Sequence, residues 1–173
     1  MEVEFPQMLM PFMVATVLLF GSLLVYGTAI HLIVRVVVGL IRSRSSDLGF
    51  WKSTAVMAIV TAITAAAHLT QIAFWAVAFL LCGQVSTLEA AFYFSAQNFT
   101  ALGYGDVLLS ERWRLLGPLE AINGLLFFGL SAAVLFAIMS NLISERLRTE
   151  TGYQSEAAGN RARLPAAGNG PSK

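Results

Sequence analysis

Charged residues are scarce in this chain of 173 residues. Lys, Arg, Asp and Glu together make up 12% of it, whereas hydrophobic residues make up 57%. The mean hydropathy is accordingly positive, at +0.70. This composition is typical of an integral membrane protein rather than of a soluble domain. The formal net charge of +1 gives no reason to expect a nucleic-acid partner.

Residues that bind metals or carry redox chemistry are equally few. Cys82 is the only cysteine, which excludes an intrachain disulfide and a cysteine-based metal cluster. His31 and His68 are the only histidines, so we do not expect a zinc site of the usual kind. The sequence also has no pairing of a nucleophile with a base. We therefore expect no enzyme and no small-molecule substrate.

Three long apolar segments dominate the chain, and each exceeds the roughly 20 residues that span a bilayer. They run from about Met8 to Ile41, from Ser53 to Leu81, and from Gly117 to Arg146. The first has no basic residue ahead of it and is too long for a cleavable signal peptide. The sequence thus predicts an all-α membrane protein with three transmembrane helices.

A shorter element lies between the second and third apolar segments. The stretch "STLEAAFYFSAQNF", residues 86–99, should form a helix that begins just after Ser86, because Ser86 and Glu89 have the spacing of a capping box. Such a helix is too short to cross a membrane and return. The polar heptad "TALGYGD", residues 100–106, follows it. Irregular backbone at membrane depth is tolerated only inside protein or along a water-filled path, so we expect a re-entrant element that lines a pore.

Two glycines in this heptad suit such a lining. Successive carbonyls can all point to one axis only if the backbone alternates in handedness, and Gly103 and Gly105 adopt positive φ at little cost. Rings of carbonyl oxygens can then replace the hydration shell of a cation. One strand cannot surround an ion, so the chain should assemble, most simply as a homotetramer.

The heptad resembles the potassium-channel signature T-V-G-Y-G-D, in that family's order of outer helix, pore helix, filter and inner helix. The segment "LEAINGLLFFGLSAAVLFAIM" is similar to the inner helix of bacterial two-span potassium channels, particularly inward-rectifier-like ones. The resemblance covers about Trp51 to Arg146. It implies three transmembrane helices plus a re-entrant pore helix and selectivity filter, assembled with four-fold symmetry. It also implies passive conduction of potassium ions.

The resemblance assigns roles to individual residues. Potassium would be coordinated by the backbone carbonyls of Ala101, Leu102, Gly103 and Tyr104. The residues that support the filter would be Thr100, Gly105, Asp106, Phe94 and Tyr93. Gating would involve Gly124 as the hinge glycine and Phe136 near the inner constriction, together with Phe128 and Gly129. Ala101 and Leu102 depart from the family pattern, and Ala101 removes the hydroxyl that completes the innermost ion site.

The distribution of basic residues predicts the orientation and the domains. Arg and Lys concentrate between Arg42 and Lys52 and in the C-terminal tail, so both regions should be cytoplasmic and the N-terminus outside. Residues 1–50 would be an extra N-terminal transmembrane helix with a basic cytoplasmic loop. Residues 51–147 would be a potassium-channel pore domain, and residues 148–173 a disordered cytoplasmic tail. The loop charges suit a bacterial inner membrane, with lipid as the surrounding partner.

Several polar residues in the apolar segments have two interpretations. One helix face carries Thr61, Thr64, His68 and Gln71. A hydrogen-bond seam between helices is favoured there over a proton sensor at His68. A similar face of the first segment, Thr28, His31 and Arg35, should pack on the pore domain or reach the membrane interface. Glu120 should be paired or solvated. Gly124 and Gly129 suit either hinges or close helix packing.

Two other classes of function remain open beside the potassium channel. A non-conducting or weakly selective membrane subunit that assembles with another protein would explain the long first segment and Ala101. A secondary transporter or membrane enzyme is disfavoured, because potassium transporters of this architecture carry four filter repeats in one chain, whereas this chain has one.

Overall fold

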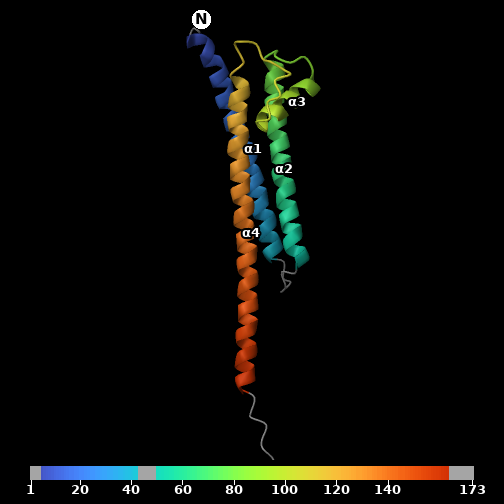
Figure 1. Cartoon of the computed structure of the whole chain (residues 1–173), viewed down its shortest axis with the longest axis vertical. Helices are drawn as coiled ribbons and strands as arrows, with labels where there is room; N and C mark the ends of the chain where they lie inside the picture. The colour runs from blue at the N-terminus through green and yellow to red at the C-terminus, as the bar shows by residue number, and fades with distance from the viewer. Residues whose placement is uncertain (1–4, 43–49, 164–173) are drawn as a thin grey trace, which may run out of the picture. The chain divides into compact units, whose positions relative to one another are not determined.

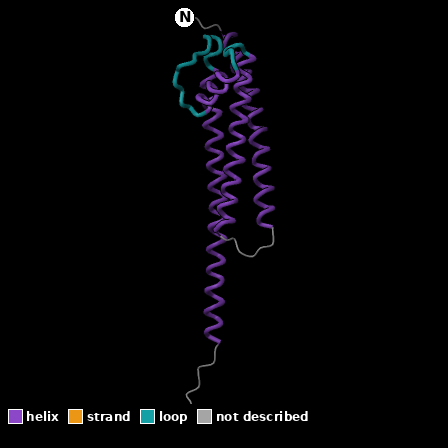
Figure 2. Tube along the Cα trace, turned by 90° about the vertical axis from the view of Figure 1, so that its right-hand side faces the viewer, coloured by secondary structure: helices purple, strands orange, loops and turns teal. Residues whose placement is uncertain are grey.

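The computed structural model describes residues 5–42 and 50–163. The described part consists of the helices α1 (Phe5–Arg42), α2 (Phe50–Leu81), α3 (Leu88–Phe99) and α4 (Leu116–Arg163). Figure 2 shows these helices joined by loops, which confirms the all-α prediction. Parts of the predicted basic loop, residues 43–49, and of the predicted tail, residues 164–173, lie outside the described residues.

Three of the described helices are long and apolar enough to cross a membrane. The candidate spans are Leu9–Leu40 in α1, Ser53–Leu81 in α2 and Leu116–Ser144 in α4. These bounds agree with the three apolar segments of the sequence. The helix α3 and the loops around it lie together at one end of the long helices (Figures 1 and 2).

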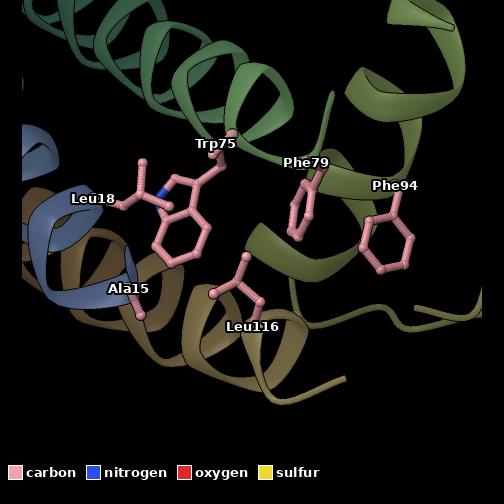
Figure 3. Close-up of a cluster of buried hydrophobic side chains, with 7 residues drawn as sticks. Ala15, Leu18, Trp75, Phe79, Phe94 and Leu116 are labelled. Atoms are coloured by element: carbon pink, nitrogen blue, oxygen red, sulfur yellow. The ribbon is translucent and has the colours of Figure 1, made fainter. Parts of the chain in front are cut away.

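A hydrophobic core at that end joins all four helices. Trp75 and Phe79 of α2 are fully buried, and Figure 3 shows them between Leu18 of α1 and Phe94 of α3. The rings of Phe79 and Phe94 meet edge to face, with centroids 4.9 Å apart. Leu116, the first residue of α4, completes the cluster. Within a bilayer such close packing, rather than the hydrophobic effect, holds helices together.

The helix α3 begins one residue later than the sequence predicted. Thr87 is its N-cap, with the Thr87 hydroxyl accepting a hydrogen bond from the backbone N–H of Ala90 at 3.2 Å. The capping box that we expected from Ser86 and Glu89 is therefore wrong in register. Adjacent serine and threonine residues offer the same capping chemistry, so sequence spacing alone does not choose between them.

The helix α4 also extends further than predicted. We expected it to end near Arg146, with a disordered tail from residue 148, but it continues to Arg163. The sequence between residues 145 and 163 is rich in Glu, Arg and Ala, which are good helix formers and offset the glycines at 152 and 159. The helix ends shortly before Pro165, which disfavours helical backbone in the residue ahead of it. By packing, the chain forms two units, Met1–Leu135 and Phe136–Lys173, and α4 contributes to both.

Candidate functional site

The heptad begins as the C-terminal cap of α3. The N–H of Ala101 donates to the carbonyl of Asn98, and the N–H of Leu102 donates to the carbonyl of Gln97, each at 2.8 Å. This pair of bonds is a Schellman motif, in which the residue after the C-cap adopts left-handed backbone. Ala101 occupies that position, with φ of 57°. The motif turns the chain sharply from the helix into the heptad.

The backbone of the heptad alternates in handedness. Positive φ occurs at Ala101, Gly103 and Gly105, with values of 57°, 54° and 76°. The residues between them, Leu102 and Tyr104, do not have positive φ. The two glycines adopt this geometry at little cost, whereas an L-residue such as Ala101 loses about 1–2 kcal/mol there. The alternation is the backbone geometry that we expected for carbonyls aligned on one axis.

Gln97 in the last turn of α3 holds both ends of the Tyr104–Asp106 stretch. Its side-chain amide donates to Oδ1 of Asp106 at 3.0 Å, and its side-chain oxygen accepts from the backbone N–H of Tyr104 at 3.1 Å. Gln97 itself is buried. On the other carboxyl oxygen, the Tyr93 hydroxyl donates to Asp106 at 2.9 Å. Three polar side chains thus fix the end of the heptad to α3.

These hydrogen bonds shift the pKa values of Asp106 and Tyr93, whose side chains are exposed. The amide of Gln97 and the hydroxyl of Tyr93 stabilise the carboxylate, so the pKa of Asp106 lies below its usual value. The same bond to Asp106 raises the pKa of Tyr93 above its usual value. Asp106 is therefore ionised and Tyr93 is neutral at physiological pH.

Side-chain packing contributes little to holding the heptad within one chain. Leu102 is 57% exposed and Tyr104 is 68% exposed. A recess of about 200 Å³ borders Gly103 and Gly105, and its other walls include Asn98 and Gly117. Thr100 is also exposed, and its hydroxyl donates to the carbonyl of Ala96 at 2.7 Å. Within one chain, the conformation of the heptad is therefore held mainly by hydrogen bonds to α3.

The helix α4 contacts the end of α3, just before the heptad, through Gly124. A Cβ atom at Gly124 would overlap the backbone carbonyl of Phe99, the last residue of α3. Close packing is therefore the interpretation that the structure favours for Gly124. A Cβ at Gly129 would meet no atom within 4 Å, so Gly129 makes no such contact inside the chain.

The other residues assigned to the site take different positions. Phe94 is buried in the hydrophobic core, whereas Tyr93 reaches Asp106. Phe128 lies with its ring against His68, at 4.8 Å between centroids. Phe136 is 67% exposed. The roles of these residues in filter support and gating stay predictions.

A seam of buried polar groups joins α1, α2 and α4 below the heptad. Gln71 donates to the Ser22 carbonyl at 3.0 Å. The Ser22 hydroxyl accepts from the indole N–H of Trp75 and from the amide of Asn123, each at 3.3 Å. Ser22 is fully buried. One serine of α1 therefore bonds to both neighbouring long helices.

A second buried group extends the seam. Ser131 of α4 lies 3.0 Å from Nε2 of His68 and 3.3 Å from the Tyr26 hydroxyl of α1. Nδ1 of His68 lies 3.4 Å from the side-chain oxygen of Gln71, which connects the two groups. The predicted hydrogen-bond seam is thus confirmed at His68 and Gln71.

The remaining polar residues of the two predicted faces do not join the seam. Thr61 is exposed, and Thr64 is buried but donates to the carbonyl of Val60 in its own helix. Thr28, His31 and Arg35 are exposed, so they do not pack on the other helices of the chain. Within one chain Ser22 and Tyr26 of α1 form the polar contacts instead, and the alternative that Thr28, His31 and Arg35 reach the membrane interface stays a prediction.

Sequence reasoning missed several residues that organise the site. Gln97 was not singled out, although a polar cluster of Ser95, Gln97 and Asn98 at the end of a short apolar helix was a visible signal. The partners of His68 and Gln71 on other helices gave no signal, because isolated serines and an asparagine in apolar segments are common.

Comparison with known families gives one match. Residues 66–141 match the family model described as "Ion channel". This region contains the second half of α2, all of α3, the heptad and α4 up to residue 141. Comparison with curated proteins and comparison with solved structures each gave no match.

Proposed function

Residues 66–141 match the ion channel family model, and from this premise we propose that four copies of the chain assemble into a potassium-selective channel. The domain is that of a channel rather than an enzyme, in an integral membrane protein with three candidate spans. The alternating backbone of Ala101, Gly103 and Gly105 is the observation that carries the proposal. Such alternation allows successive carbonyls of one strand to point to a common axis, where they can coordinate a cation.

The proposed filter is the heptad, residues 100–106. Carbonyls of Ala101, Leu102, Gly103 and Tyr104 from four chains would replace the hydration shell of potassium ions. The helix α3 ends at the base of the filter, where the partial negative charge of its C-terminus favours a cation. The Thr100 hydroxyl is engaged by α3, which supports Ala101 as the residue at the innermost site.

Assembly around a four-fold axis is supported by the apolar groups that one chain leaves exposed. Leu102, Tyr104, Leu125 and Leu126 are each more than half exposed. Neighbouring copies would cover such side chains around the filter and along α4. The exposed Phe136 would then belong to an inner constriction that closes the pore by dewetting, and Gly129 would be free to bend α4.

Potassium and sodium flux through reconstituted protein tests the proposal. Purified protein in liposomes should pass potassium and not sodium. Gly103→Val is the matched non-conducting control, because a β-branched residue at φ of 54° is strained and removes the alternation. Equal passage of both ions would overturn selectivity. Absence of flux in correctly assembled protein would favour a non-conducting subunit.

We further propose that the filter faces outside and that the basic loop and C-terminus are cytoplasmic, as in a bacterial inner membrane. Cys82, just after α2, is half-buried, and burial raises the pKa of its thiol. An impermeant maleimide at mildly alkaline pH should label it from outside intact cells, and Cys82→Ser should abolish the label. Labelling only from the inner face would reverse this orientation.

A further inference from the structure

Glu120 is a buried carboxyl group that the proposed conduction does not use. It lies in the second turn of α4, within the candidate span Leu116–Ser144, and it is fully buried. Of the two states expected for Glu120, paired or solvated, the structure shows the paired one, because its carboxyl group is hydrogen-bonded to Ser95. The carboxyl group of Glu120 lies between α4 and α3, although glutamate side chains are usually exposed.

The hydrogen bonds of Ser95 reveal where a proton must lie. The Ser95 hydroxyl is 2.8 Å from the backbone carbonyl of Ile72 in α2 and 2.5 Å from Oε1 of Glu120. A hydroxyl has one proton to donate, and a backbone carbonyl can only accept. Both contacts are hydrogen bonds only if Ser95 donates to Ile72 and Glu120 donates to Ser95. That arrangement requires a protonated carboxyl group.

The surroundings of Glu120 agree with a neutral acid. The polar side chains beside it are the Ser95 hydroxyl and the Asn98 amide, which are both uncharged. The second carboxyl oxygen accepts no hydrogen bond of ordinary geometry within the described residues. A buried carboxylate without a cationic partner is strongly unfavourable, so such a group takes up a proton instead.

We propose that Glu120 is a protonated carboxylic acid whose relay through Ser95 to the carbonyl of Ile72 fixes α3 between α2 and α4. Glu120 is then a positioning residue. Ser95 lies two residues before Gln97, whose side chain is hydrogen-bonded to Tyr104 and Asp106; we call these two hydrogen bonds of Gln97 the filter clamp. If Ser95 loses its hydrogen bonds, α3 becomes less fixed and the filter clamp weakens. The effect on ion selectivity rests on the proposed channel function, whereas the protonation and the relay do not.

Infrared spectroscopy of reconstituted protein at neutral pH tests the protonation directly. The carbonyl stretching band of a protonated carboxyl should be present in the wild type and absent from Glu120→Gln. Ser95→Ala should keep the band at a shifted frequency, because the acid loses its hydrogen-bond partner. A spectrum identical in the wild type and Glu120→Gln overturns the inference, whatever the flux.

Selectivity measurements test the positioning role. Glu120→Gln should retain the potassium-to-sodium flux ratio, because its amide can still donate to Ser95. Ser95→Ala and Glu120→Leu should each lower that ratio about fivefold, the effect of one lost buried hydrogen bond. If Glu120→Gln lowers the flux ratio as much as Glu120→Leu does, the inference that Glu120 acts as a neutral hydrogen-bond donor is wrong. Ser95→Ala keeps the test decisive should Glu120→Leu fail to fold.

If the wild type shows no potassium selectivity, the proposed channel function is wrong. The hydrogen-bond relay from Glu120 through Ser95 is then tested by measuring the free energy of unfolding of variants. The stability losses of Ser95→Ala and Glu120→Leu should then be non-additive in the double variant, because both changes break one relay. Additive losses overturn the relay.

Discussion

The heptad and the polar seam are held in different ways. The heptad, residues 100–106, is exposed in the single chain, borders a recess and depends on side chains of α3 for its shape. The seam, formed by Ser22, Tyr26, His68, Gln71, Trp75, Asn123 and Ser131, is buried and forms within one chain, although the side-chain oxygen of Asn123 has no hydrogen-bond partner among the described residues. One chain therefore contains a finished helical scaffold and an unfinished site. Changes in the seam should affect stability, and changes in the heptad should affect selectivity.

The largest effect is expected where the two regions meet. Gly124→Ala should lower the free energy of unfolding by about 1–3 kcal/mol and disturb the filter, because its Cβ would overlap the Phe99 carbonyl. Gly129→Ala is the matched control, with open space around the new Cβ and a gain in helix propensity of about 1 kcal/mol. Thermal unfolding in detergent compares the stability of the two variants, and flux from liposomes measures the disturbance of the filter in Gly124→Ala. Equal stability of the two would show that Gly124 is not tightly packed.

A change in the seam should reduce stability without changing ion preference. Ser22→Ala leaves the indole N–H of Trp75 and the amide of Asn123 without their acceptor, at a cost of about 1–3 kcal/mol. Thr28→Ala is the control on the exposed face of α1, where the hydroxyl bonds only to its own helix. Chemical unfolding in detergent measures the difference. A Ser22→Ala channel with normal stability and altered selectivity would remove the proposed division between the regions.

A change in the filter clamp should alter ion preference and leave the stability of the helices largely unchanged. Gln97→Leu removes the hydrogen bonds to Asp106 and to the N–H of Tyr104, so the potassium-to-sodium flux ratio should fall about fivefold. Gln84→Leu serves as the control, since Gln84 bonds to Ser110 in the neighbouring loop and not to the heptad. Unchanged selectivity in Gln97→Leu would mean that assembly, rather than α3, shapes the filter.

The smallest effect concerns external acid. The pKa of Asp106 is lowered by Gln97 and Tyr93, so the stabilisation by its carboxylate is present above the ordinary value of 3.8. It is lost only as the pH falls through the lower value of the folded state. Selectivity should thus be constant on external acidification to about pH 5. In Gln97→Leu the loss should begin at higher pH, and identical profiles for the two proteins would contradict the clamp.

The sequence predicted the parts of the molecule that depend on local pattern. The three spans follow from hydrophobic length, and the heptad is recognisable because its glycines have a specific backbone role. The partners of His68 and Gln71 were not predictable, because Ser22, Asn123 and Ser131 are distant in the chain. The start of α3 at Leu88 and the end of α4 at Arg163 were missed for a different reason. Neighbouring capping residues and a mixed stretch of helix formers and glycines each permit several boundaries.

The reversal potential of the reconstituted protein tests the central claim most directly. With potassium on one side of a planar bilayer and sodium on the other, a potassium-selective filter should give a large reversal potential of the sign that potassium selectivity requires. The Gly103→Val control should give no current. A wild-type reversal potential near zero, with open channels present, would contradict a potassium-selective filter at residues 100–106.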